Sequence, residues 1–147
     1  DVVERRIHLG RVLTERIADA PGITALPLSD DYEVSWWNYI FHITGHDPDE
    51  FAAALRAEGV SVGVRYIQDP IYMRGDFLVR KVTYGKTQCP FSCPATSREY
   101  EYGPELVPDA VKGLKTVAVM GLHEHMGEDD IVDMAAAICK VADGLSA

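Results

Sequence analysis

The sequence predicts an α/β domain of the α+β two-layer kind, in which helices pack on one face of a small mixed sheet. Helical and strand patterns alternate along the chain, which is the first observation behind this prediction. The second is that 147 residues, 47% of them hydrophobic, are enough to build one core. The third is that no repeat, low-complexity stretch or long linker divides the chain. We therefore expect residues 1–147 to form a single domain.

The first half of the chain predicts one helix followed by two strands. Residues 2–19 are typical of a helix with Ile7, Leu13 and Ile17 facing inward, and Pro21-Gly22 should end it. A short strand is expected over residues 23–28. The clearest strand pattern is VSWWNYIFHI, residues 34–43, because it is rich in β-branched and aromatic side chains.

A helix start follows at Asp47-Pro48, where an aspartate can cap the free N–H groups and proline suits the first helical position. Gly59 should end this helix, and residues 60–66 should form the next strand. The proline-containing stretch 67–107 lacks either periodicity and is expected to be a long ordered loop. Loops of this length are often functional.

The C-terminal part predicts a short helix over 108–115, a strand over 116–122 and a last helix that begins near Glu128. The buried face of that helix is predicted from apolar residues at helical spacing. These residues are Ile131, Met134, Ala135, Ile138, Val141 and Leu145.

Composition excludes several classes of protein. The formal net charge of −9 argues against binding to nucleic-acid phosphates. No apolar run reaches the length of a membrane span, and the N-terminus lacks the order of a signal peptide. Three cysteines do not make a disulfide framework, so we expect a reducing, cytoplasmic setting. The chain begins with Asp1 instead of Met, which suggests that it starts inside a longer one.

Several segments resemble motifs of one known family, in the family's order. The aromatic stretch Trp36–Phe41 is similar to its "H-x-W-x-x-Y/F" strand, and Leu55–Val60 to its "L-x-x-x-G-I/V". Val64–Tyr66 and Pro70–Tyr72 resemble its "V-x-Y…P-L-H". Gly127–Ile131 resembles the "T-E-E-D-V" that opens its last helix.

The resemblance is to sugar aminotransferases of the DegT/DnrJ/StrS type and extends from about Val12 to Leu145. It implies the C-terminal small domain of a fold-type-I enzyme that uses pyridoxal 5'-phosphate (PLP), without the large domain that binds the cofactor. Such enzymes are typically homodimers and transfer an amino group from glutamate or glutamine to a keto sugar or cyclitol. Arg65 and Tyr72 stand where many relatives have His, which bears on the identity of the substrate. Thr83-Tyr84-Gly85 and the later Pro90-Phe91 fit a subset of the family with a longer loop.

Transamination requires a lysine that forms a Schiff base with the cofactor. No lysine of this chain lies in the serine-rich, histidine-containing context of the family's cofactor lysine. The lysines are Lys81, Lys86, Lys112, Lys115 and Lys140. We therefore expect the isolated chain to be inactive and its role in the enzyme to be substrate binding and active-site closure.

Arg65 is the sharpest candidate for substrate binding, because a guanidinium can clamp a carboxylate or phosphate through two hydrogen bonds. The alternative is an arginine at a strand end that pairs with a surface acid. Tyr66 and Tyr72 could bind sugar hydroxyls, although tyrosines are also common core or rim residues.

Trp36 and Trp37 should point to opposite faces if their strand is regular, so one of them belongs to the core. The other could line the active site or the interface with the large domain. Asn38 completes the set of candidate substrate-binding residues.

Two other functions remain open from the residues alone. Cys89, Cys93, His123 and His125 could supply four ligands to zinc, with His-x-His placing both rings on one face of a strand. The chain could also be a stand-alone binding module, without enzymatic activity, that docks a partner through its Trp36–Phe41 face.

Overall fold

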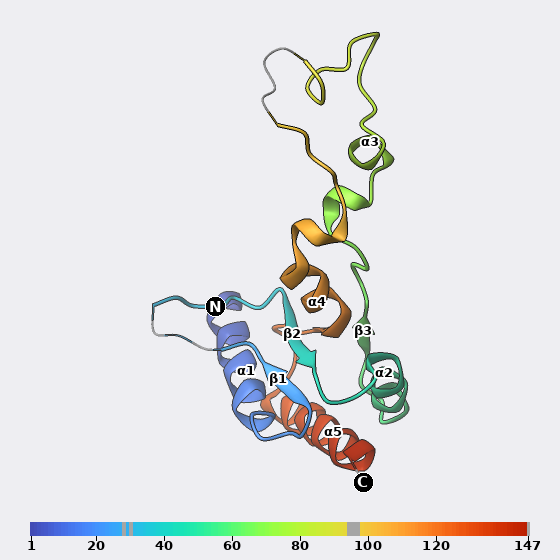
Figure 1. The fold of residues 1–147 in the computed structure, drawn as a ribbon. Helices are drawn as coiled ribbons and strands as arrows, with labels where there is room; N and C mark the ends of the chain where they lie inside the picture. The colour runs from blue at the N-terminus through green and yellow to red at the C-terminus, as the bar shows by residue number, and fades with distance from the viewer. Residues whose placement is uncertain (28, 30, 94–97, 147) are drawn as a thin grey trace. The chain divides into compact units, whose positions relative to one another are not determined.

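The computed structural model describes residues 1–27, 29, 31–93 and 98–146. They form two compact units, one of residues 1–66 and 115–147 and the other of residues 67–114. The elements are α1 (Val2–Arg16), β1 (Ile23–Ala25), β2 (Asn38–Ile43), α2 (Pro48–Ala57), β3 (Val62–Val64), η1 (Ile71–Met73), α3 (Asp76–Val79), η2 (Pro104–Leu106), α4 (Pro108–Thr116), β4 (Val117–Gly121) and α5 (Glu128–Ser146). Figure 1 shows their course along the chain.

The first unit contains a four-stranded sheet in the order β1-β2-β4-β3. Each neighbouring pair is antiparallel, so the expectation of a mixed sheet is wrong. The reason lies in the connections. Strands β2 and β3 are joined through α2 and run in the same direction, but β4 lies between them and is antiparallel to both.

The two faces of the sheet differ as the alternation of β2 predicts. Tyr39, Phe41 and Ile43 are buried, whereas the side chains between them are half-buried. The buried face belongs to one core that includes residues of α1, α2 and α5, which confirms helices packed on one face of a small sheet. Helices α1 and α5 pack side by side (Figure 1).

The helix start predicted at Asp47-Pro48 is confirmed, and the structure adds a capping box at the start of α1. Asp47 accepts hydrogen bonds from the backbone N–H groups of Asp49 and Glu50, both at 3.0 Å, and Pro48 occupies the first position of α2. Asp1 and Glu4 form a capping box at the start of α1.

All four predicted strands are shorter in the structure. Strand β2 begins at Asn38 and not at 34, because Trp36 has a φ of 44°, a left-handed conformation that a strand cannot contain. Strand β3 ends at Val64 and not at 66, because Arg65 has a φ of 52°. Strand β1 ends at Ala25, and residue 28 of the predicted strand lies outside the described residues. Strand β4 covers Val117–Gly121, one residue shorter at each end than predicted.

The second unit has more regular structure than the loop predicted over 67–107. It contains η1, the single turn α3 and η2 before α4 begins. An aromatic cluster centres on Tyr102, whose ring centroid lies 6.1 to 6.4 Å from those of three other side chains. The three are Tyr72, Phe91 and Tyr100.

Candidate functional site

Arg65 lies directly after β3, beside the first turn of α2. Its Nε is 2.9 Å from Oδ2 of Asp49, and its Nη2 is 3.9 Å from Oδ2 of Asp47. Asp47 therefore caps the helix with one carboxylate oxygen and faces the guanidinium with the other. The arginine side chain is 43% exposed. The sequence offered a substrate clamp or a pair with a surface acid, and the structure contains the pair.

This ion pair also orients the guanidinium. A guanidinium has five N–H donors in a rigid plane, and Asp49 occupies the one on Nε. Since the contact with Asp47 is long, the Nη groups keep donors that an anionic or hydroxyl-rich ligand can reach. The left-handed backbone of Arg65 is one that residues other than glycine adopt only when surrounding contacts hold it.

One tryptophan belongs to the core and the other does not, as predicted, although both precede β2 and are not in a regular strand. Trp36 is 3% exposed and Trp37 is 80% exposed. The indole of Trp36 packs on Tyr39, with ring centroids 4.7 Å apart, so it belongs to the core. Because Tyr39 and Phe41 are also buried, the Trp36–Phe41 segment offers Trp37 as its large exposed ring and no broad docking face.

Trp37 contacts Arg6, which in turn binds Glu124; neither residue was a candidate from the sequence. The guanidinium of Arg6 lies over its indole, 5.4 Å from the ring centroid, in a cation–π contact. Nε and Nη2 of Arg6 both donate to one carboxylate oxygen of Glu124, at 2.9 and 2.7 Å. No local sequence signal points to this pair, because Arg6 and Glu124 are 118 residues apart.

The remaining candidates lie in different surroundings. Asn38 is exposed and pairs with Gly121 across the sheet. Tyr66 is 76% exposed. Tyr72 belongs to the second unit, where its hydroxyl donates to the carbonyl oxygen of Gly103 at 2.6 Å. The structure thus brings Trp36, Trp37 and Asn38 together at the start of β2, and Arg65 with Tyr66 after β3.

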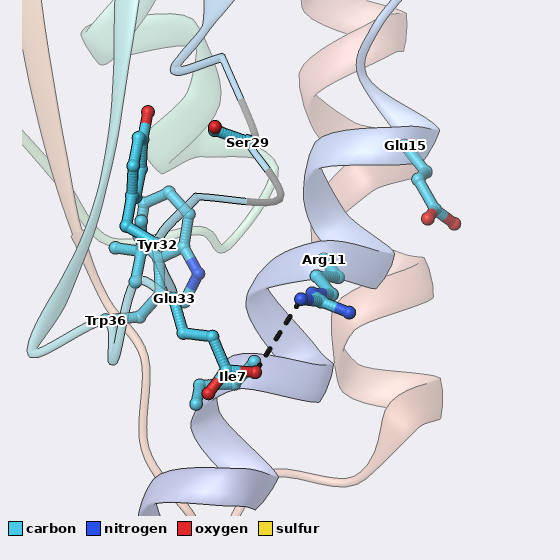
Figure 2. Close-up of a pocket in the computed structure, with 8 residues that line it drawn as sticks. Ile7, Arg11, Glu15, Ser29, Tyr32, Glu33 and Trp36 are labelled. Carbon is cyan, nitrogen blue, oxygen red and sulfur yellow. Dashed lines mark ion pairs between the residues drawn. The ribbon is translucent and has the colours of Figure 1, made fainter.

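A hollow of about 240 Å³ lies between α1 and the segment that leads into β2 (Figure 2). Arg11 projects from α1 and Glu33 from the facing segment, with Nη2 and Oε1 3.8 Å apart. Tyr32 and Trp36 lie on the same side as Glu33. The lining of the hollow combines one cation, Arg11, with two acids, Glu15 and Glu33, and two aromatic rings. Such a lining fits ordered water as well as it fits a small polar ligand.

The proposed zinc ligands fall into two separate pairs. His123 and His125 lie in a turn after β4, not on a strand, because β4 ends at Gly121 and the N–H of Met126 donates back to the carbonyl of His123 at 3.1 Å. Cys89 and Cys93 belong to the second unit. Among the described residues, no three histidine, cysteine or acidic side chains gather where they could hold a metal.

The lysines in the described part of the chain do not fit a cofactor site. A Schiff-base lysine is activated by a lowered pKa. In Lys81 the pKa is raised, chiefly by a hydrogen bond of 2.6 Å from Nζ to Glu101, so its amine stays protonated. Lys140 is likewise bound to Glu58 at 2.7 Å, and Lys86, Lys112 and Lys115 are exposed.

None of the helices in the described ranges is long and apolar enough to cross a membrane. No curated protein sequence matches the chain.

Solved structures of several aminotransferases share the fold, including the following three. One is a DegT DnrJ EryC1 StrS aminotransferase from Brucella abortus, with a TM-score of 0.67 and 17% identity over 94% of this chain and 30% of its own. The second is the PLP form of a candidate sugar aminotransferase from Streptococcus pneumoniae, with a TM-score of 0.68 and 14% identity over 98% and 32%. The third is DesV from S. venezuelae in complex with a ketimine intermediate, with a TM-score of 0.68 and 17% identity over 97% and 32%.

This chain therefore spans about a third of the length of these structures. The sequence profile of one family, the DegT/DnrJ/EryC1/StrS aminotransferases, matches residues 1–138, which is nearly the whole chain. The chain belongs to the DegT/DnrJ/EryC1/StrS aminotransferase family.

Proposed function

We propose that the chain is the C-terminal small domain of a PLP-dependent sugar aminotransferase. The observation that carries this proposal is the family match over residues 1–138 by a chain about a third as long as its structural neighbours. A large domain would supply the cofactor site and the catalytic lysine, since the lysines described here do not fit that role. The complete enzyme would be a cytoplasmic homodimer.

The contribution of this domain is substrate binding and closure of the active site. Arg65 supports this role because Asp49 fixes its Nε while its Nη donors stay accessible. A keto sugar or cyclitol offers hydroxyls, and a nucleotide-linked sugar also offers phosphate, which arginine binds through two parallel bonds. The amino donor would be glutamate or glutamine. Trp37 and Tyr66, both exposed, would lie against the substrate or the large domain.

PLP would supply the electron sink for amino transfer when it is bound to the complete enzyme. The residues of this chain orient the amino acceptor and exclude water. In this proposal they neither form a bond to the cofactor nor carry the transferred proton.

The test begins with the coding DNA upstream of the Asp1 codon. We expect the reading frame to continue into a large domain with a lysine in a loop containing serine and histidine. The complete protein should then retain PLP through gel filtration, as its visible absorbance shows, and the present chain alone should not. A complete protein that retains no PLP, or a chain that retains it stoichiometrically by itself, would contradict the proposal.

A further inference from the structure

Cys89 and Cys93 form the closest pair of thiols in the described chain. Their Sγ atoms lie 2.9 Å apart, with Cys89 donating to Cys93. Bonded sulfur atoms are about 2.05 Å apart. A movement of less than an ångström would therefore bring the two within bonding distance. Cys89 is exposed and Cys93 is half-buried, so a small reagent can reach the pair.

We propose that Cys89 and Cys93 are a redox-active dithiol, which a small-molecule disulfide such as oxidised glutathione converts into an intramolecular disulfide. This inference does not depend on the aminotransferase assignment, because it concerns only the chemistry of the two thiols. The third cysteine, Cys139, belongs to the other unit, where it is half-buried in α5 with its Sγ 3.7 Å from the carbonyl of Arg16.

The reaction balances as two thiol–disulfide exchanges. A thiolate of the pair attacks one sulfur of oxidised glutathione, the glutathione S–S bond breaks, and one glutathione leaves. The second protein thiol then loses its proton and attacks the protein sulfur of the mixed disulfide, and the second glutathione leaves. The two protein thiols are oxidised, one glutathione disulfide is reduced to two thiols, and the two protons end on glutathione.

The hydrogen bond between the thiols raises the pKa of Cys89. Either sulfur can attack as the thiolate, and the other then resolves the mixed disulfide.

The position of the pair connects it to a candidate substrate residue. Phe91 lies between the two cysteines in sequence, and its ring meets Tyr102 edge-on with centroids 6.1 Å apart. Tyr102 in turn lies 6.2 Å from the ring of Tyr72. A disulfide between residues 89 and 93 would restrain the backbone that carries Phe91 into this cluster. Oxidation of the pair would thus alter the packing of the aromatic rings that contact Tyr72.

The experiment treats the folded, reduced chain with oxidised glutathione under native conditions, alkylates the remaining thiols and maps peptides by mass spectrometry. We expect loss of two hydrogens, a peptide that links Cys89 to Cys93, and alkylation of Cys139. Dithiothreitol should restore all three thiols. The matched control, Cys139→Ser, should show the same loss of two hydrogens.

Single variants test the second step. Cys89→Ser should stop at one glutathionyl group on Cys93, and Cys93→Ser at one on Cys89. Three results would overturn the proposal. They are a wild-type chain that keeps glutathione on one cysteine without closing, disulfide-linked dimers in place of the internal bond, and thiols at 89 and 93 that both remain open to alkylation.

Discussion

The indole of Trp36 lies directly against the backbone of Gly10 in α1. A Cβ built on Gly10 would be 2.3 Å from Cδ1 and from Nε1 of that ring, far inside a normal contact. The close approach explains how a residue just before β2 reaches the core with 3% of its surface exposed. It also explains a glycine inside a helix, where the residue is otherwise unfavourable.

Gly10→Ala should therefore destabilise the chain by about 1–3 kcal/mol, the usual cost of overpacking a core. The measurement is chemical denaturation followed by circular dichroism. Gly144→Ala is the matched control, because it is also within a helix and a Cβ there would meet nothing within 4 Å. That variant should be unchanged or stabilised by up to about 1 kcal/mol. Equal effects of the two substitutions would contradict the packing described here.

A buried hydrogen-bond chain joins α1 to β2. The hydroxyl of Thr14 donates to the carbonyl of Gly10 at 2.8 Å, so its oxygen accepts from the hydroxyl of Tyr39, also at 2.8 Å. Burial raises the pKa of Tyr39 to about 12. An unfolded tyrosine loses its proton near pH ~10. Folding therefore favours the neutral form of Tyr39. Its contribution to the free energy of unfolding is fully present below about pH 10 and is lost between about pH 10 and 12.

We expect the free energy of unfolding to fall over that range by up to about 3 kcal/mol from this group. Tyr39→Phe should remove this part of the decline and lower stability near neutral pH by about 1 kcal/mol, through loss of one hydrogen bond. The measurement is denaturation at about pH 9 and about pH 11.5. Tyr84→Phe, at a fully exposed ring, should leave the decline intact. The same decline in Tyr39→Phe and wild type would refute the assignment.

Protonation of Glu124 should change the surroundings of Trp37, because Arg6 contacts both residues. The pKa of Glu124 is lowered, first by a hydrogen bond from its own backbone N–H and then by the bond from Arg6. The ionised carboxylate stabilises the folded state at every pH above the ordinary pKa of glutamate. This stabilisation is lost as the pH falls through the lowered pKa of Glu124. Protonation should release Arg6 from its place over the indole.

Fluorescence of Trp37 should therefore change at a pH below about 4.3, the ordinary value for glutamate. The signal can be isolated as the difference between the wild type and Trp37→Phe, since Trp36 is buried. Glu124→Gln should abolish the transition, and Glu128→Gln, at an exposed carboxylate that contacts His8, should keep it. A transition that persists in Glu124→Gln would show that another group causes it.

The sequence predicts the elements of the first unit well because their signals are local. The cap at Asp47, the inward stripe of α5 and the alternation of Tyr39, Phe41 and Ile43 each depend on neighbouring residues and a fixed period. The sheet order was not predictable in this way. Whether β4 inserts between β2 and β3 depends on contacts between residues far apart in sequence.

The candidate site was predictable only in part. The family motif identified Arg65, but its left-handed backbone and its bond to Asp49 depend on how β3 meets α2. Strand alternation predicted that one of Trp36 and Trp37 is buried, but both precede β2, and the packing of Trp36 on Gly10 required the structure. Arg6 and Glu124 are 118 residues apart, which no local pattern can connect.

The role of Arg65 in the complete aminotransferase is the central claim, and steady-state kinetics of Arg65→Ala test it most directly. We expect kcat/KM for the keto substrate to fall about 100-fold or more, in line with the loss of a charge-assisted bidentate contact of about 3 kcal/mol, while PLP affinity stays within about twofold. Arg80→Ala, which removes another exposed, ion-paired arginine, should leave both unchanged. Equal loss of substrate use and PLP affinity, or no change in either, would contradict the account.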